Sequence, residues 1–173
     1  MDTFLKTVGN LLPYHLLSYG ALLGTELYQS FINTKICYQA LPMKEFIILQ
    51  KRLFPIYFGT QVGLAALTAA TRPPYSIISL VRDPWGMASL AVVAVTGCLN
   101  WIIYGPRTTT ASLVRRALQE SENNNSDSDG SKTHRANRNF TRNHAMAIHL
   151  NAIAMIATVV YGFSLSATLV EGM

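Results

Sequence analysis

The residues best able to do chemistry lie on one stripe of the first long apolar segment, 11–36. With about 100° of rotation per residue, a helix over this segment would keep its main polar residues within about 40° of the direction of the first. They are His15, Glu26, Gln29 and Asn33. An ionisable side chain is costly in the middle of a membrane helix unless it faces protein or water. We therefore expect this stripe to face the interior of a helix bundle.

Two interpretations of Glu26, the only carboxylate of the segment, are open. It could act in a proton or cation relay, since a buried carboxyl group can exchange a proton with its neighbours. It could instead hold helices together by hydrogen bonds, each contributing about 1 kcal/mol. We favour the second interpretation because hydrogen bonding between helices needs no other functional residues.

The other apolar segments offer polar partners for this stripe. On a helix, His144 and Asn151 of the last segment point within about 20° of each other. The second segment adds Gln61 and the third adds Asn100. Together with the first stripe they predict a polar seam through the bundle, with Glu26 as its carboxylate.

No residue pattern indicates a cofactor, a metal site or an enzyme. His144 and His149 are five residues apart, whereas two imidazoles on one helical face need a spacing of three or four. Cys37 and Cys98 are far apart in the sequence and lack the CxxC spacing of zinc and redox sites. Nucleophile-elbow and phosphate-loop motifs are also missing from the sequence. We expect a protein without catalytic chemistry, bound metal or cofactor.

The composition shows which elements must position these residues. Half of the 173 residues are hydrophobic and 13% are charged, whereas a soluble domain has about a quarter charged. Nearly all charges lie between uncharged apolar runs. We predict one all-α domain over 1–173, a four-helix transmembrane bundle with the bilayer as its partner. The predicted transmembrane helices are 11–36, 53–71, 84–104 and 145–170.

The segments between the predicted transmembrane helices are read from helix-breaking residues and amphipathic patterns. Asp83 and Pro84 suit the N-cap and first position of the third helix. Short amphipathic helices are predicted at the membrane interface over 41–54, ending at a Pro55 kink, and over 108–119, after Gly105 and Pro106 stop the third helix. The polar tract 121–138 is predicted to be a disordered loop.

The basic residues predict orientation. Loops 37–54 and 105–144, with Lys35 at their edge, hold eleven Lys and Arg, against three on the other side. Basic loops usually face the cytosol, so both termini are expected on the opposite side of an endomembrane or mitochondrial membrane. Arg107 and Arg142 would mark the membrane boundary. Because the charges flank apolar segments, the net charge of +5 does not indicate nucleic acid binding.

Two glycine pairs predict close helix packing. Gly20 and Gly24 form one GxxxG motif, and Gly59 and Gly63 form another. Such motifs let helix backbones approach closely in membranes. They favour a helix crossing within the chain, or contact with a second copy or another membrane protein.

Several sequence blocks resemble the transmembrane protein 205 family, in its fungal branch. The blocks are Leu41-Pro42, Leu53-Phe54-Pro55-Ile56-Tyr57-Phe58, Pro106-Arg107-Thr108-Thr109, Asn139-Phe140-Thr141-Arg142-Asn143-His144 and Leu27-Tyr28-Gln29-Ser30-Phe31. The resemblance implies a four-span membrane protein of poorly defined activity, whose animal form is linked to secretory membranes and drug tolerance. It supplies no agreed catalytic residues. We expect a non-enzymatic accessory in membrane organisation, trafficking or drug tolerance; the alternative is a small oligomeric proton- or cation-coupled transporter.

Overall fold

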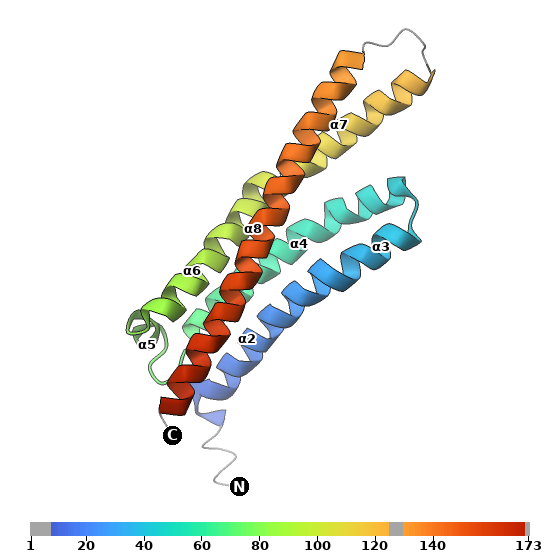
Figure 1. The fold of residues 1–173 in the computed structure, drawn as a ribbon. Helices are drawn as coiled ribbons and strands as arrows, with labels where there is room; N and C mark the ends of the chain where they lie inside the picture. The colour runs from blue at the N-terminus through green and yellow to red at the C-terminus, as the bar shows by residue number, and fades with distance from the viewer. Residues whose placement is uncertain (1–7, 125–129, 172–173) are drawn as a thin grey trace.

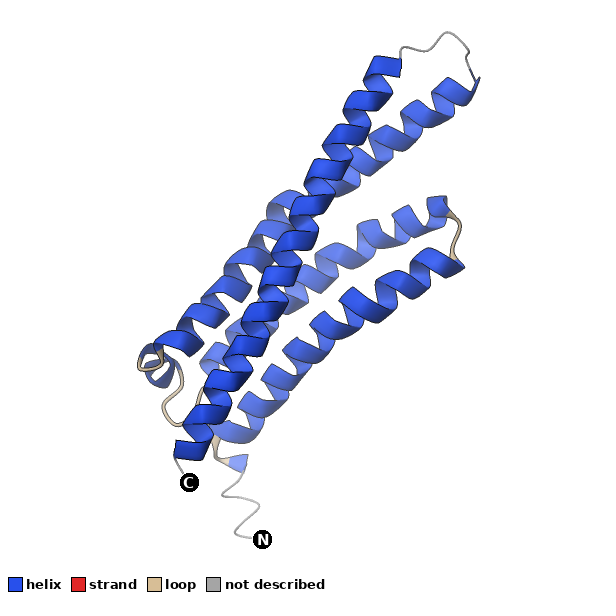
Figure 2. Cartoon of the chain, in the orientation of Figure 1, coloured by secondary structure: helices blue, strands red, loops and turns tan. Residues whose placement is uncertain are grey.

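The computed structural model describes residues 8–124 and 130–171, and the regular elements within these ranges are all helical (Figure 2). No strand occurs among the described residues. The all-α prediction is therefore confirmed for this part of the chain. Each of the four predicted apolar segments is helical, but the elements between them differ from the predictions.

The first helical arm consists of α2 (Leu11–Leu27), η1 (Tyr28–Asn33) and α3 (Thr34–Ala40) in direct succession. Asn10 caps its start by accepting a hydrogen bond from the Leu12 amide, 3.0 Å away. In the π-helical turn η1, the Thr34 amide bonds to the Gln29 carbonyl, one residue further back than in an α-helix. The arm thus continues through 11–40 with one widened turn.

The second arm is the single helix α4 (Met43–Ala70), which contains Pro55. The helix predicted over 41–54 is present from Met43, but its predicted end at Pro55 is wrong. A proline removes one backbone hydrogen bond, to the carbonyl four residues earlier, and helix formers on both sides can carry the helix through it.

The third arm begins after the short helix α5 (Ile77–Val81) and comprises α6 (Pro84–Leu99), η2 (Asn100–Tyr104) and α7 (Gly105–Asn124). Asp83 caps α6 by accepting a hydrogen bond from the Gly86 amide at 2.9 Å, as predicted. The predicted stop at Gly105 and Pro106 is wrong. In η2 the Gly105 amide bonds to the Asn100 carbonyl, and this wider turn leads the chain past the proline without ending the helix.

The last arm is α8 (Gly130–Glu171), so most of the tract predicted to be disordered is helical. Within 121–138, α7 extends to Asn124 and α8 begins at Gly130, while 125–129 lie outside the described residues. The physical reason is packing between the two helices. The Arg115 guanidinium of α7 lies 4.1 Å from the centre of the Phe140 ring, and Ala136 is buried.

The four arms run side by side near the start of α2 and the end of α8 and separate into two hairpins at the other end (Figure 1). One hairpin is α3 with α4, and the other is α7 with α8. We call this the basic end, because it carries exposed or half-buried basic residues. They are Lys35, Lys44, Lys51, Arg52, Arg107, Arg115, Arg116, Lys132, Arg135, Arg138 and Arg142.

Within the described ranges, three helical stretches are long and apolar enough to cross a membrane: Met43–Ala70, Pro84–Glu122 and Gly130–Val170. Large apolar side chains point outward from the bundle, including Phe163 and Leu17, which are 75% and 72% exposed. Such a surface is stable against lipid tails and unfavourable in water. These features indicate an integral membrane protein in contact with the bilayer.

Candidate functional site

Four helices converge on the Glu26 carboxyl group in the middle of the bundle. Glu26 on α2 and Gln61 on α4 are both fully buried, and the Gln61 side-chain amide donates to Glu26 Oε1 at 2.7 Å. Gly97 of α6 makes room for this amide, since a Cβ there would lie 3.2 Å from Gln61 Oε1. Thr158 of α8, also fully buried, interacts with the same carboxyl group. We call this arrangement the Glu26 layer.

A second set of hydrogen bonds lies next to the Glu26 layer, towards the basic end. The Tyr57 hydroxyl donates to Asn151 Oδ1, and Asn151 Nδ2 donates to Ser30, both at 2.8 Å. These bonds join α4, α8 and η1. Asn100, at the start of η2, donates to the Ala147 carbonyl at 3.1 Å. Both π-helical turns thus contribute side chains at this level.

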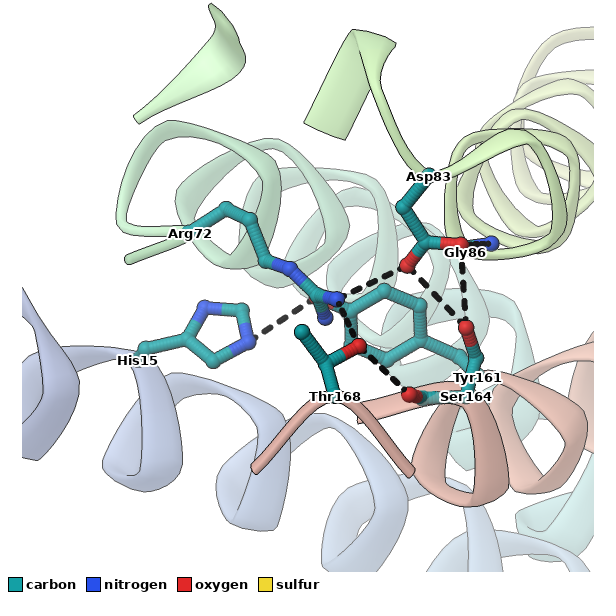
Figure 3. Close-up of polar contacts among 7 residues, drawn as sticks. All are labelled: His15, Arg72, Asp83, Gly86, Tyr161, Ser164 and Thr168. Atoms are coloured by element: carbon teal, nitrogen blue, oxygen red, sulfur yellow. Dashed lines mark hydrogen bonds and ion pairs between the residues drawn. The ribbon is translucent and has the colours of Figure 1, made fainter. Parts of the chain in front are cut away.

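A buried ion pair holds the opposite end of the bundle together (Figure 3). Arg72, which follows α4, is 1% exposed, and its Nη2 lies 2.8 Å from Asp83 Oδ2. The same guanidinium donates to the Tyr161 hydroxyl at 3.1 Å and to Thr168 at 3.0 Å. Ser164 donates to the Asp83 carboxylate at 3.0 Å. We call these residues, with His15, the Arg72 cluster.

The hydrogen bonds of this cluster can all be made with His15 neutral. Arginine can only donate, so the Tyr161 oxygen accepts from Arg72, and its hydroxyl proton is then available to His15 Nε2, 2.9 Å away. His15 Nδ1 then carries the ring proton and faces the Thr71 hydroxyl at 3.3 Å. An open cavity of about 500 Å³ adjoins the cluster, lined by residues that include Asn10, Arg72 and Leu165.

An apolar layer separates the two polar sites. Leu22, Ala65 and Val93, which are at most 2% exposed, fill the centre of the bundle between them. The Tyr19 hydroxyl lies beside this layer, against Gly162. The structure therefore shows two polar sites divided by buried hydrocarbon, where the sequence predicted one continuous seam.

The predicted seam residues do not all lie in these two sites. His15 belongs to the Arg72 cluster, whereas Glu26, Gln61, Asn100 and Asn151 lie in or next to the Glu26 layer. Gln29 and Asn33 bond to each other at 2.8 Å within η1 and do not bridge helices.

His144 is exposed and stacks on Phe140 at a ring distance of 5.2 Å, so its place in the seam was wrongly predicted. The helix extends beyond the bundle there, which removes the partners that would bury it. The predicted boundary residues Arg107 and Arg142 are exposed at the basic end.

The glycine motifs do not mark helix crossings at three of their four positions. A Cβ on Gly20, Gly24 or Gly63 would meet no atom within 4 Å among the described residues. A Cβ on Gly59 would lie 3.3 Å from the Trp101 ring of η2. The close approaches occur instead at Gly97 and Gly162, which the sequence analysis did not single out for packing.

Sequence reasoning also missed the Arg72 cluster. Arg72 was one of the three basic residues counted on the side opposite the basic loops, and Asp83 was predicted only as a helix cap. The two are eleven residues apart across a predicted connection, a spacing that could have suggested an ion pair. The described residues contain no group of three or more His, Cys, Asp or Glu side chains placed to hold a metal ion. The structure thus offers two buried polar sites, a carboxyl group among neutral partners and a compensated ion pair.

A helical membrane protein with a polar centre is the class that this architecture defines. Residues 17–117 match the family described as "Domain of unknown function (DUF4149)". The whole chain is 58% identical over 173 residues to "Xanthocillin biosynthesis cluster protein D" of Aspergillus fumigatus, and the match covers all of both chains. This chain therefore belongs to the DUF4149 family. No solved structure matches it, and membership of the transmembrane protein 205 family stays a prediction.

Proposed function

We propose that this protein is a non-enzymatic membrane component serving a biosynthesis cluster of the xanthocillin type. The observation that carries this proposal is the full-length identity of 58% to xanthocillin biosynthesis cluster protein D. The alignment covers all of both chains, so the likeness is not confined to one segment. The likeness to the transmembrane protein 205 blocks is compatible with such an accessory role.

We further propose a fourth span formed by α2 and η1, which completes a four-helix transmembrane bundle. Helix continues without a gap from Leu11 to Ala40, and about 20 residues of helix cross a bilayer core. Leu16, Leu17 and Phe31 expose large apolar side chains from this arm. These side chains would lie in water if the arm stayed outside the membrane.

The charges support an orientation with the basic end in the cytosol. At the opposite end, Arg72 is buried in its ion pair and only Arg82 of the described basic residues is exposed. The difference in exposed basic charge between the two ends is thus larger than the count of Lys and Arg in the sequence indicated. Basic segments are retained on the cytosolic side during insertion, which favours this orientation.

The absence of enzymatic chemistry is part of the proposal and rests on how the polar groups are used. Arg72 bonds to Asp83, and His15, Arg72 and Asp83 each bond to hydroxyl groups of α8. Such mutually satisfied groups stabilise a bundle. The other candidate, a small oligomeric coupled transporter, receives less support because buried hydrocarbon at Leu22, Ala65 and Val93 divides the polar sites.

The experiment is deletion of the gene in the fungus that carries it, with restoration by the wild-type chain. We expect less cluster product, or product in another cell fraction, without accumulation of a precursor that the purified protein converts. A tagged chain should stay in carbonate-washed membranes. Turnover of an accumulated precursor by the purified protein would overturn the non-enzymatic role, and unchanged product amount and distribution would overturn the link to the cluster.

A further inference from the structure

Buried polar atoms without a hydrogen-bond partner are confined to one part of the molecule. Among the described residues, they occur at the Glu26 layer, at the basic end (Arg115, Arg116 and Thr133) or between the two, and none occurs in the Arg72 cluster. Within the bundle they are Glu26 Oε2, Gln61 Oε1, Asn100 Oδ1, both polar atoms of the Gln50 side chain, and Thr108 Oγ1. Because buried polar groups normally have partners, this one-sided distribution points to access by water from the basic end.

The same direction is marked by polar side chains that are already bonded. From Glu26, the next polar groups towards the basic end are the Tyr57, Asn151 and Ser30 side chains, which bond in sequence. In the other direction, Leu22, Ala65 and Val93 fill the centre of the bundle. Glu26 therefore has polar neighbours on the side of the basic end and hydrocarbon on the other side.

The partners of Glu26 leave one of its oxygens without a donor. Oε1 accepts from the Gln61 side-chain amide, whereas Oε2 accepts no hydrogen bond, since the neighbouring Thr158 hydroxyl donates to the Ala154 carbonyl at 3.1 Å. The spare atoms nearby, Gln61 Oε1 and Asn100 Oδ1, are acceptors as well. A set of unfilled acceptors around one carboxyl group requires a positive charge or a donor, and a proton on the carboxyl group supplies the donor without needing extra space.

The ionisable groups around Glu26 do not supply a compensating charge. Tyr19 of α2 and Tyr57 of α4 interact electrostatically with it, and both are phenols. At this level α6 contributes Thr96 and α8 contributes Thr158, which do not ionise. Tyr161 of α8 and the charges of Arg72 and Asp83 lie in the cluster beyond the apolar layer.

We propose that Glu26 is a proton-binding site that exchanges with the compartment at the basic end only, through a path lined by Gln61, Asn100, Tyr57 and Asn151. The inference assumes the proposed membrane insertion but not a role in a biosynthesis cluster. Binding transfers one proton from water to the carboxylate, with no other bond made or broken. Loss of that proton leaves a negative charge among four closely packed helices, so the bundle must loosen to admit water.

The first experiment measures protonation directly on the full-length protein in detergent, by infrared spectroscopy. We expect the carbonyl band of a buried protonated carboxyl group in the wild type, its loss as the pH is raised, and its absence from Glu26→Gln. The wild-type unfolding temperature should fall over the same pH range, and that of Glu26→Gln should fall less. Should Glu26→Gln fail to fold, the wild-type band and its pH response still decide the matter. Absence of the band from the wild type would overturn the proposal.

A salt comparison separates a proton from a metal ion. Sodium, potassium and choline chlorides at equal ionic strength should give the same unfolding temperature. A higher unfolding temperature in one metal salt, lost in Glu26→Gln, would show that a metal ion occupies the site and would overturn proton binding.

The second experiment tests the direction of access by cysteine labelling in vesicles, with Cys37 and Cys98 replaced by serine. Ser30→Cys should react with a charged thiol reagent added at the basic end, and not from the other side. Leu22→Cys, its matched control in the apolar layer, should stay unreactive from both sides. Labelling of Leu22→Cys, or of Ser30→Cys from the opposite end, would overturn one-sided access. Carbonate extraction of the same vesicles reports insertion separately.

Discussion

The Tyr161 hydroxyl lies between His15 Nε2, 2.9 Å away, and Arg72 Nη1, 3.1 Å away, and so joins α2, α8 and the end of α4 through one oxygen atom. Tyr161 is fully buried, and its ring also lies beneath the Arg72 guanidinium at 5.5 Å. A single side chain thus couples three helices at the end opposite the basic one. This coupling makes the Arg72 cluster the best place to test what holds the bundle together.

Replacing Tyr161 with phenylalanine should lower the free energy of unfolding by about 1–3 kcal/mol. The reason is that His15 Nε2 and Arg72 Nη1, both buried, lose the hydroxyl group to which they bond. The measurement is thermal or denaturant unfolding of the purified protein in detergent. Tyr75→Phe is the control, since Tyr75 is 66% exposed and its replacement should have little effect. Equal stability of Tyr161→Phe and the wild type would show that the hydroxyl is not structurally important.

Replacing Arg72 with alanine should destabilise the protein more strongly, by about 3 kcal/mol, because the largely buried Asp83 carboxylate loses its counter-charge. The exposed fractions of the Arg72 and Asp83 side chains are 2% and 17%, so water screens the pair only weakly. Arg82→Ala provides the matched control because Arg82 is exposed. If both variants unfold alike, the ion pair contributes nothing beyond a surface charge.

The sequence predicted the apolar elements well because an uninterrupted run of hydrophobic residues has few alternatives to a buried or membrane helix. It failed at Pro55 and at Gly105-Pro106, where rules for local helix breaking were applied to helices that neighbouring segments support on both sides. The π-turn η2 is a rearrangement of backbone hydrogen bonds, and composition does not reveal it.

The candidate site was only partly predictable for a related reason. Helical angles identify which residues share a face, so Glu26 could be placed in the interior from its stripe. They do not show which helix lies opposite, and the pairing of Glu26 with Gln61 was one option among several. Arg72 was missed because a charge at the end of a span usually faces water, whereas here α5 and the start of α6 bring Asp83 back to it.

Replacing Gly97 with alanine should cost about 1–3 kcal/mol, because overpacking a close-packed core forces neighbours to move. The added Cβ would lie 2.9 Å from the Val62 side chain and 3.2 Å from Gln61 Oε1. The unfolding midpoint of Gly97→Ala in detergent measures this effect.

Gly20→Ala is the control for Gly97→Ala. It should be stabilising by about 0.5–1 kcal/mol, since alanine loses less conformational entropy in a helix and a Cβ at Gly20 meets nothing within 4 Å. A destabilised Gly20→Ala would contradict this assignment and would indicate that a second copy packs on the motif. Crosslinking of the wild type would then be expected to trap a dimer.

The helical hairpin of α7 and α8 can be tested by amide hydrogen exchange, because backbone amides in a helix exchange slowly and those of a disordered loop exchange at once. We expect protection over 109–120 and 132–140, where Ser112 and Ala136 are buried. Phe140→Ala should reduce this protection because it removes the ring beneath Arg115 and beside His144. Phe163→Ala is the control: it removes an equally large ring that is 75% exposed on the same helix, and protection of the hairpin should not change. Immediate exchange throughout 121–138 in the wild type would restore the prediction of a disordered loop, since a helix of these polar residues is stable only while its partner helix packs against it.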